Sequence, residues 1–254
     1  MRIITYNVNG IRAAIKKGFV DWLATDPADV ICLQEIKAHP ENVDGSLVEQ
    51  LGYHQYWYPA RKRGYSGVAV FTKTAPLKVY YGNGNTQSDE EGRLIRLDFP
   101  RFSLINAYFP SGTTGEIRQC YKYLWLEQFM GYLSELRREV PRLIVCGDYN
   151  ICHKAIDIHD PIRNKNSSGF LPEERRWMDE FFAAGFVDTF RHFNTEPHQY
   201  SWWSYRANAR NNNKGWRIDY INATEPLKDQ LRSARILPEV RHSDHCPVYL
   251  ELNS

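Results

Sequence analysis

The sequence predicts an α/β domain in which β-sheets pack face to face and helices lie on the outside. Strand-like runs recur along the whole chain, and helical patterns fall between only some of them. Hydrophobic residues make up 43% of the 254 residues, which is enough for a substantial core, and no linker, repeat or low-complexity tract divides the chain. Domains of this kind are built as packed layers around one core, so we expect a single domain over residues 1–254.

Segments with the apolar content and the length of β-strands begin near the N-terminus and continue to the C-terminus. The run at 143–146, Leu-Ile-Val-Cys, is apolar throughout and predicts a buried strand. In chain order the predicted strands are residues 2–8, 30–34, 53–58, 67–72, 93–98, 103–108, 143–146, 217–222, 234–237 and 248–252.

Three segments have a helical pattern. Residues 17–24 form a short one. Residues 115–138 place apolar side chains at helical spacing, and this helix ends before Pro141. Residues 172–184 begin with a proline and two glutamates, which suits a helix N-terminus, and they end before Gly185. The asparagine-rich segment 208–214 predicts an exposed loop.

The composition argues against several classes of protein. No stretch approaches the roughly 20 apolar residues that span a bilayer, and the first residues enter a strand pattern without the features of a signal peptide. The five cysteines are odd in number and form no Cys-x-x-Cys pair, so we expect reduced thiols. The formal net charge is only +2, so any basic surface must be local. We expect a cytoplasmic protein with no membrane partner.

Polar side chains recur where the predicted strands end. Asp148 and Asn150 follow the buried strand at 143–146. Because alternate residues of an extended segment point to the same face, we expect this carboxylate and carboxamide to converge, where they could activate a water or hold a metal ion. Gly-Asp is also an ordinary turn sequence, but function tends to lie on loops held by a rigid scaffold. The other polar residues near strand ends are Asn7, Asn9, Gln34, Glu35, Asn106, Tyr108, Asp219, Asp244 and His245.

These residues belong to motifs that occur in a fixed order: Asn-Val-Asn-Gly at 7–10, Leu-Gln-Glu at 33–35, Ser-Gly-Val-Ala at 66–69, Asn-Ala-Tyr-Phe-Pro at 106–110, Gly-Asp-Tyr-Asn at 147–150, Gly-Trp-Arg-Ile-Asp-Tyr at 215–220 and Ser-Asp-His-Cys-Pro at 243–247. With them the chain closely resembles the exonuclease III family of apurinic/apyrimidinic (AP) endonucleases, within the endonuclease/exonuclease/phosphatase superfamily. The resemblance covers essentially the whole chain.

The resemblance implies a fold and an activity. The fold is a DNase I-like four-layer α/β sandwich, with two mixed β-sheets face to face, helices outside and the site at one edge. The activity is hydrolysis of the backbone 5′ to abasic sites in double-stranded DNA, together with 3′→5′ exonuclease and 3′-phosphatase or 3′-phosphodiesterase activity on blocked 3′ ends. It also leads us to expect a monomer that associates with the nucleoid through DNA.

The resemblance assigns catalytic roles to five residues. Asp148 is expected to activate the attacking water, and Asn150 to orient that water or the scissile phosphate. His245 is expected to donate to a phosphate oxygen, with Asp219 as the carboxylate on its other nitrogen. Tyr108 either contacts the phosphate through its hydroxyl or protonates the leaving group. Whether Asp148 is a base, a ligand of a second metal ion or both also stays open.

Cleavage of a phosphodiester further predicts a hard cation, because the anionic oxygens repel a nucleophile. Mg²⁺ takes oxygen ligands and keeps several waters, so one or two carboxylates suffice, and Mn²⁺ is an alternative. Glu35 is the first candidate ligand, as the resemblance also implies, with Asn7 nearby and Asp244 as a further ligand. Asp148 and Asn150 complete the candidate set, for one metal ion or two.

Several basic side chains could face DNA phosphates, or could be ordinary solvated charges. The resemblance favours Arg12, Lys37 and Arg118, which match its pattern, and Arg206, which lies where the family inserts a side chain at the lesion. Phosphate contacts of this kind make binding steeply salt-dependent. The other candidates for contact with DNA are Lys16, Arg61, Lys62, Arg63, Asn164 and Lys165.

Trp202, Trp216 and Ile218 could simply belong to the core, since tryptophans bury a large area. In the family, an aromatic, a tryptophan and an aliphatic residue at these spacings wall a small apolar pocket. That pocket admits a flipped-out sugar without its base and excludes a normal nucleotide. The match therefore favours cleavage at abasic sites over a purely exonucleolytic role.

Three positions depart from the family pattern. Ser111 and Ser167 stand where some members carry asparagines that contact DNA phosphates, and Asn9 replaces an aspartate. These departures bear on the balance among the three activities and not on the reaction class.

Two other functions compete with a nuclease: a phosphatase or phospholipase of the same superfamily, acting on inositol phosphates or sphingomyelin, and a non-catalytic binding protein. The tryptophan pocket and residues 208–210 favour DNA, and the presence of Glu35, Asp148 and His245 favours catalysis.

Overall fold

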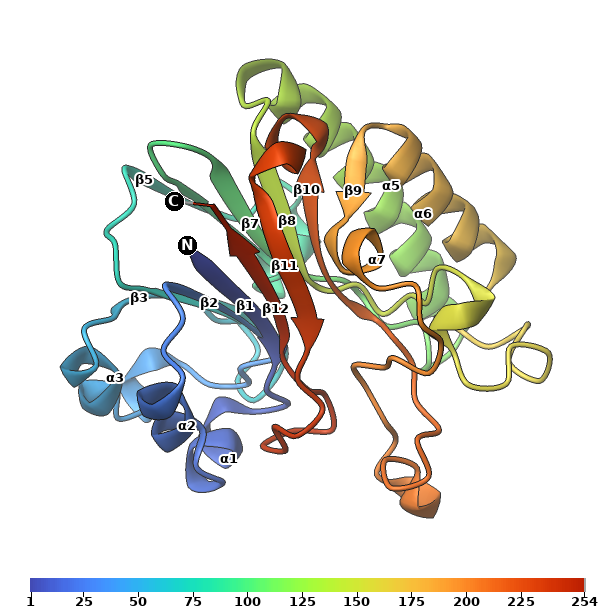
Figure 1. Cartoon of the computed structure of the whole chain (residues 1–254), viewed down its shortest axis with the longest axis horizontal. Helices are drawn as coiled ribbons and strands as arrows, with labels where there is room; N and C mark the ends of the chain where they lie inside the picture. The colour runs from blue at the N-terminus through green and yellow to red at the C-terminus, as the bar shows by residue number, and fades with distance from the viewer. Residues whose placement is uncertain (254) are drawn as a thin grey trace.

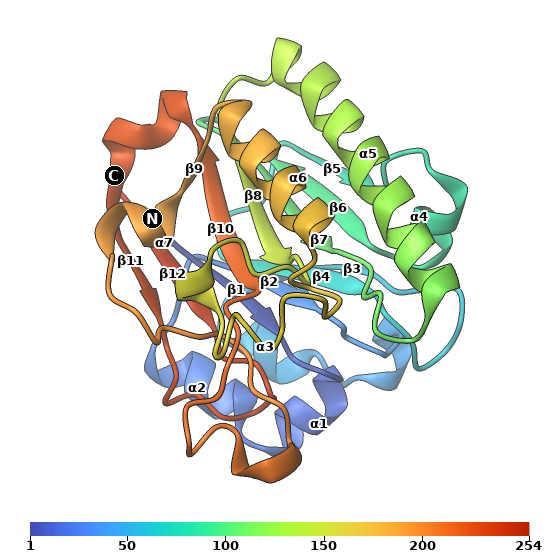
Figure 2. The same cartoon turned by 90° about the vertical axis from the view of Figure 1, so that its right-hand side faces the viewer.

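The computed structural model describes residues 1–253 and contains two six-stranded β-sheets that pack face to face between two outer layers of helices (Figure 1, Figure 2). The predicted four-layer α/β sandwich is therefore confirmed. Both sheets are mixed, because each has one parallel pair among antiparallel neighbours.

The first sheet has the order β11-β12-β1-β2-β4-β3 and the second has the order β5-β6-β7-β8-β10-β9. The strands of the first sheet are β1 (Arg2–Asn7), β2 (Val30–Gln34), β3 (His54–Tyr58), β4 (Val68–Thr72), β11 (Leu231–Ile236) and β12 (Val248–Leu252). The strands of the second sheet are β5 (Lys78–Tyr81), β6 (Leu94–Asp98), β7 (Ser103–Tyr108), β8 (Leu143–Asp148), β9 (Phe186–Asp188) and β10 (Asp219–Thr224).

Helices cover the outer faces, with the N-terminal ones beside the first sheet and the long α5 and α6 across the second (Figure 2). The α-helices are α1 (Ile11–Lys16), α2 (Phe19–Thr25), α3 (Ser46–Gln50), α4 (Thr86–Glu90), α5 (Glu116–Glu139), α6 (Pro172–Ala183) and α7 (Thr189–Phe193). Short 3₁₀ turns are η1 (Pro40–Asn42), η2 (Ala155–Asp157), η3 (Arg206–Asn208) and η4 (Glu225–Gln230). Within residues 1–253, no helix has both the length and the apolar character that a bilayer crossing requires.

Three apolar layers hold the sandwich together. The central layer combines side chains of both sheets, such as Ile3 of the first and Ile144 of the second. The outer layers join Phe19 of α2 to the first sheet, and Phe129 of α5 and Met178 of α6 to the second. Burial of this apolar surface is the main favourable term in folding.

The two parallel pairs, β1 with β2 and β7 with β8, both end at the same edge of the sandwich. Asn7 of β1 and Asp148 of β8 mark this edge, since the amide of Asn7 donates to Asp148 across the two sheets at 2.8 Å. The carboxyl ends of four strands therefore converge on one place.

Two of the polar residues near strand ends, Gln34 and Asn106, do not face the edge and have a structural role. The side chain of Gln34 donates to Asn106 Oδ1 at 2.7 Å, and Asn106 Nδ2 donates to the carbonyls of Leu33 and Ala69. Both side chains are fully buried between the sheets. They form a polar tie across the central layer, just behind the convergent edge.

The strand predicted at 143–146 continues to Asp148. Gly147 makes this possible: its φ is +143°, and a Cβ there would lie 1.8 Å from the carbonyl oxygen of Ala107 on β7. Only glycine allows β7 and β8 to approach this closely. The glycine that looked like the end of the strand is thus part of it, and Asp148 is its last residue.

Candidate active site

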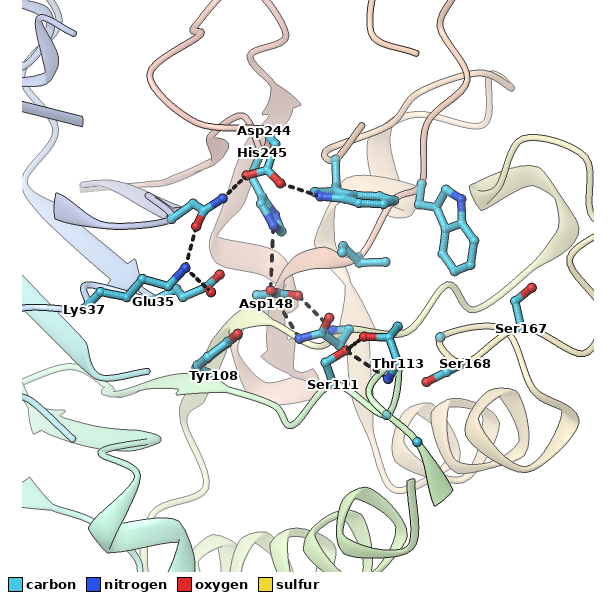
Figure 3. Close-up of a pocket in the computed structure, with 18 residues that line it drawn as sticks. Glu35, Lys37, Tyr108, Ser111, Thr113, Asp148, Ser167, Ser168, Asp244 and His245 are labelled. Carbon is cyan, nitrogen blue, oxygen red and sulfur yellow. Dashed lines mark hydrogen bonds and ion pairs between the residues drawn. The ribbon is translucent and has the colours of Figure 1, made fainter. Parts of the chain in front are cut away.

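A cleft of about 800 Å³ opens at the edge where the two parallel pairs end. Figure 3 shows Asp148 and His245 facing one another at its centre, with Glu35 and Lys37 on one side and Ser111 and Thr113 below. The predicted site residues that line this cleft are Glu35, Lys37, Tyr108, Asp148, Asn150, Trp202, Trp216, Ile218, Asp244 and His245.

Asp148 and Asn150 do converge, but not by the alternation of an extended strand. The backbone of Asn150 is left-handed, with φ +51°. Its N–H donates to Asp148 Oδ1 at 2.8 Å, and its side-chain amide donates to Asp148 Oδ2 at 3.3 Å and to the carbonyl of Phe109 at 3.0 Å. A turn after the strand therefore brings the two side chains together, which corrects the extended geometry expected from the sequence.

His245 and Asp219 form a buried pair beside Asp148. Asp219 begins β10 and lies opposite Asp148 in the antiparallel register. Its carboxylate is 2.9 and 3.1 Å from His245 Nδ1, and the hydroxyl of Ser201 donates to the same carboxylate at 2.6 Å. The other ring nitrogen, Nε2, lies 4.0 Å from Asp148 Oδ2. His245 is thus oriented from behind and presents Nε2 to the cleft.

Burial and charge shift the acidity of both central groups. Burial raises the pKa of Asp148 to about 7, and the charge of Asp219 adds to this, while His245 and the bonds from Asn150 and Asn7 act in the opposite sense. Burial lowers the pKa of His245, but the Asp219 carboxylate, helped by Asp148 and Asp244, raises it to about 10. Near neutral pH, His245 is then a cation that can donate a hydrogen bond, and Asp148 is poised to exchange a proton.

Glu35 supplies a partly exposed carboxylate to the cleft, with 21% of its side chain exposed. Asn7 Nδ2 donates to Glu35 Oε2 at 3.1 Å, and Lys37 Nζ lies 2.8 Å from Glu35 Oε1. Carboxylate oxygens held this way, with Asp148 nearby through Asn7, suit a hard divalent cation. The oxygen of Asn7 accepts the N–H of Asn9 at 2.9 Å. Asn7 therefore faces the two carboxylates with its amide N–H groups and orients them.

A further carboxylate of the cleft, Asp244, lies beside His245 and accepts a hydrogen bond on each of its oxygens (Figure 3). Asn9 Nδ2 donates to Asp244 Oδ1 at 2.9 Å, and Trp202 Nε1 donates to Asp244 Oδ2 at 3.0 Å. Asn9 in turn accepts from Lys37 Nζ at 2.6 Å. The asparagine that replaces the family's aspartate therefore links Lys37 to Asp244, which an aspartate with no N–H could not do.

One compact group of potential metal ligands within residues 1–253 is Asp148, Asp219 and His245, whose ligand atoms lie within 4.8 Å of one another. Asp219 already accepts from His245 and Ser201, so a cation there would have to displace the bond that orients the histidine. The arrangement fits a proton and charge relay better than a metal cage. Glu35, outside this group, remains the carboxylate best placed for a cation.

Tyr108 enters the cleft from the end of β7, and burial with the charges of Glu35 and Asp148 raises its pKa well above the usual value. It therefore keeps its proton. Arg93, almost fully buried, donates to the carbonyl of Tyr108 at 2.8 Å and lies 4.9 Å from the centre of its ring. The tyrosine hydroxyl is thus a neutral hydrogen-bond donor, on a ring that packs against Arg93.

Trp202 and Trp216 form one wall of the cleft. Their rings are 6.0 Å apart and nearly perpendicular, and they pack on a buried apolar cluster that includes Ile218. Both tryptophans are only partly buried, so each has a face toward the core and a face toward the cleft. The three residues singled out from the sequence are brought together, and Gly169 also lies against Trp216.

The predicted DNA contacts differ in their exposure and in their hydrogen bonds. Arg12, Lys165 and Arg206 are exposed outside it. Arg118 is held by two bonds to Glu91 and one to the hydroxyl of Tyr65. Asn164 donates to the carbonyls of His159 and Asp160 at 3.0 Å, so it shapes its own loop. Ser111 and Ser167, the two departures, both line the cleft.

Sequence reasoning missed three supports of the site. Ser201 holds Asp219, and Arg93 holds Tyr108. Lys122 and Glu174, fully buried between α5 and α6, form an ion pair at 2.5 Å, and Lys122 donates to the carbonyl of Asn150 at 2.8 Å. A charged residue in the apolar stripe of the long helix was the one available signal for Lys122, and no motif marks Ser201.

Comparisons with known proteins identify the family of the chain. The profile of the Endonuclease/Exonuclease/phosphatase family matches residues 4–245. The exodeoxyribonuclease of Bacillus subtilis (strain 168) is 45% identical over 255 residues and covers 100% of both chains. The DNA repair nuclease APEX1 of Danio rerio is 40% identical, over 99% of this chain and 82% of its own length.

Solved structures give the same result. The 3′-5′ exonuclease NExo of Neisseria meningitidis superposes with a TM-score of 0.93 at 26% identity, and an AP endonuclease of Archaeoglobus fulgidus with 0.91 at 30%, each over 100% of both chains. The resemblance stated from the motifs is thereby confirmed. The chain belongs to the Endonuclease/Exonuclease/phosphatase family.

Proposed function

We propose that the protein is a DNA-repair phosphodiesterase that hydrolyses the backbone 5′ to abasic sites in double-stranded DNA, with 3′→5′ exonuclease and 3′-phosphatase or 3′-phosphodiesterase activity. The observation that carries this proposal is one cleft in which Asp148 and the His245–Asp219 pair face an apolar wall of two tryptophans. The relatives named above support it, as does a structure of the 3′ phosphatase NExo bound to a product DNA hairpin, which is 26% identical with a TM-score of 0.92.

The chain's own residues carry the proposed chemistry. Asp148 takes a proton from the attacking water, and Asn150 orients that water or the phosphate. His245, fixed by Asp219, donates from Nε2 to a phosphate oxygen as negative charge develops. Tyr108 donates from its hydroxyl to the phosphate, or protonates the leaving oxygen, for which water is the alternative proton donor. A positioned general base contributes on the order of 10²–10⁴-fold to such a reaction.

We propose Mg²⁺ as the cofactor, with Mn²⁺ as a substitute. Glu35, oriented by Asn7, would hold it, and Asp148, Asn150 and Asp244 are the remaining candidates. When bound, the ion would neutralise charge on the phosphate, which weakens the repulsion of a nucleophile. The oxygen-rich donor set is the observation that fits this ion, because Mg²⁺ prefers carboxylate and carbonyl ligands.

Two groups of side chains would bind the substrate. Trp202, Trp216 and Ile218 would receive the flipped-out sugar of an abasic site, which fits a small apolar wall better than a nucleotide with its base. Phosphates on either side would meet basic and polar side chains around the cleft: Arg12, Lys37, Arg118, Asn164, Lys165 and Arg206.

We also propose that the chain acts as a monomer and as a single catalytic domain, in the cytoplasm with its DNA. The support for a single domain is the shared central layer, to which both sheets contribute side chains. Gel filtration at the concentration of the assay tests the oligomeric state.

One gel tests the proposed function. Three labelled DNAs are offered with Mg²⁺ and with EDTA: a duplex with an abasic-site analogue, a recessed 3′ end, and a 3′-phosphate. Cleavage 5′ to the abasic site with Mg²⁺, and none with EDTA, is the expected result. If all three DNAs stay intact with Mg²⁺, the proposal fails, and an inositol phosphate or sphingomyelin substrate becomes the next to test.

A further inference from the structure

Arg210 makes an unusual set of contacts with the segment that carries the catalytic histidine. Its Nη1 donates to the carbonyl of Ser243 at 2.8 Å and lies 3.5 Å from that of His245. Its Nη2 donates to the carbonyls of Pro238 at 3.0 Å and Val240 at 2.7 Å. One guanidinium therefore binds the segment between β11 and β12 at both ends and in its middle.

The contacts join two loops that lie apart in the sequence. Arg210 belongs to the loop at 205–214, before β10, and Figure 1 shows this orange loop and the red β11–β12 loop projecting from the same end of the sandwich. The first loop carries Arg206, which we propose contacts DNA. The second carries Asp244 and His245.

Trp203 contacts both Arg210 and the segment between β11 and β12. The guanidinium of Arg210 lies 4.7 Å from the centre of the Trp203 ring. The backbone N–H of Trp203 donates to the carbonyl of Asp244 at 3.0 Å, and its indole N–H donates to Asn213 Oδ1 at 3.1 Å. The arginine is thus held between an aromatic face and a row of carbonyls, which restricts its orientation.

No carboxylate of residues 1–253 lies within ion-pair distance of Arg210. An arginine that serves only as a counter-charge would have one, as Arg217 has in Asp157. Carbonyl oxygens are instead its partners, and the planar fork of the guanidinium can meet several of them at once, whereas a lysine ammonium offers a single point. The geometry is that of a clamp on the backbone.

We propose that Arg210 is a positioning residue, which fixes the Ser243–His245 segment against the 205–214 loop and so sets His245 when that loop meets DNA. This rests on the proposed function for the role of His245. Arg210 does not line the cleft, and its contacts with the segment are to backbone carbonyls and not to the side chains of the site. Its effect passes through the backbone that carries the histidine.

The test compares Arg210→Met, Arg210→Lys and the control Arg241→Met. Methionine keeps much of the stem and removes the donors, and lysine keeps the charge without the fork. Arg241 comes from the same segment, is exposed, and makes only a 3.5 Å contact with Asn211. We expect kcat on the abasic duplex to fall about 10–100-fold in both Arg210 variants, because small misplacement of a catalytic group costs this much. KM should change less than threefold, and the control should match the wild type.

Backbone hydrogen exchange provides a second readout that does not depend on activity. Peptides covering residues 238–246 should exchange faster in both Arg210 variants and not in Arg241→Met. Full kcat in Arg210→Lys would show that charge and not the fork matters. A rise in KM at constant kcat would make Arg210 a DNA-surface residue. Either result, or unchanged exchange, overturns the proposal.

The failure of the two proposals can be told apart. If the wild type cuts no DNA, the proposed function fails, and hydrogen exchange still decides whether Arg210 clamps the segment. If Arg210→Met loses cooperative unfolding, Arg210→Lys carries the test, because it retains the stem and the charge and is the milder change.

Discussion

Asp148 is a residue on which several contacts of the cleft converge. It accepts from Asn7 and twice from Asn150, it faces His245 at 4.0 Å, and it lies opposite Asp219 in the sheet. Its acidity is therefore set by neighbours from both sheets. A carboxylate whose pKa is raised to about 7 is suited to accept a proton near neutral pH.

Asp148→Asn should lower turnover on abasic DNA by about 10²–10⁴-fold, because asparagine keeps the shape and cannot accept the proton. DNA binding should persist. Single-turnover cleavage and a gel-shift assay measure the two quantities. Asp21→Asn, on the exposed side of α2, is the matched control and should behave as wild type. Near-normal turnover of Asp148→Asn would reject the assignment.

Asp157 lies behind the tryptophan wall and matters for stability. It is buried between Arg217 and Arg191, and the two guanidinium groups donate four hydrogen bonds of 2.7–3.1 Å to its carboxylate. Burial alone would raise the pKa of Asp157, but these two cations lower it to about 2. Since the folded pKa lies below the unfolded value of about 3.9, the charge stabilises the fold above that pH, and the benefit is lost as pH falls toward 2.

Asp157→Asn should therefore destabilise the protein by about 3–5 kcal/mol at pH 7, as expected for a buried ion pair that loses one partner. The difference from wild type should shrink between pH 4 and pH 2. Urea unfolding at pH 7 and at pH 3 measures both values. A difference that stays constant across this range would contradict the role of the charge.

The chemistry at residue scale was predictable, and the geometry was not. Sequence motifs identified Asp148, Asn150 and His245 because their types and order are specific. The left-handed turn at Asn150 was not predictable, since it depends on the hydrogen bonds to Asp148 and Phe109 that only the folded chain brings together. The role of the Ser201 hydroxyl was not predictable either, because only the folded chain brings it to Asp219.

At the scale of elements, the site depends on two parallel strand pairs that end side by side. Long, strongly patterned elements were predicted well: the helix expected at 115–138 is α5, and that expected at 172–184 is α6. Missing from the prediction were β5, β9, α1, α3, α4 and α7. Each is six residues or fewer, so it contains too little of a period to be recognised, and tertiary packing decides its form.

The Lys122–Glu174 pair joins α5 and α6 to the loops of the cleft. Glu174 accepts the N–H groups of Gly169 and Leu171, and Lys122 donates to Asn150. Lys122→Met leaves an unpaired buried carboxylate and should cost about 3–5 kcal/mol in the free energy of unfolding.

Adding Glu174→Gln to Lys122→Met should recover part of that loss, because glutamine has no charge and still accepts from the backbone. The exposed pair Arg138–Glu135 is the control, and Arg138→Met should cost less than about 1 kcal/mol. Urea unfolding measures all four proteins. A double variant no more stable than Lys122→Met would show that the lysine acts by packing and not by charge.

The whole molecule has a net charge of only +2, so attraction to DNA must come from the arrangement of charge around the cleft. Arg12, Lys165 and Arg206 are exposed candidates for contact with DNA. The 30 acidic residues of the chain offset nearly all of the 32 basic ones in the net charge. Composition alone could not reveal this surface, because it depends on which loops the fold brings to one end.

Duplex affinity should fall about 10–100-fold between 50 and 200 mM salt, as expected for roughly three phosphate contacts. Lys165→Gln should reduce the slope of log affinity against log salt by about 1. Fluorescence anisotropy with a catalytically inactive variant measures the slope. Lys228→Gln, at the opposite end of the sandwich in η4, should leave it unchanged. A flat salt dependence would argue against a DNA substrate.

Four residues of the cleft, Asn9, Glu35, Lys37 and Asn150, have left-handed backbones with φ between +45° and +54°. For residues other than glycine, such conformations cost of order 1–3 kcal/mol each. Glycine at any of them would relieve the strain of the left-handed backbone, but it would also remove a side chain whose hydrogen bonds help to build the site. A laboratory selection for DNA cleavage should therefore keep these four side chains even though their backbone is strained. The strained turns mark where function has been kept at the expense of stability.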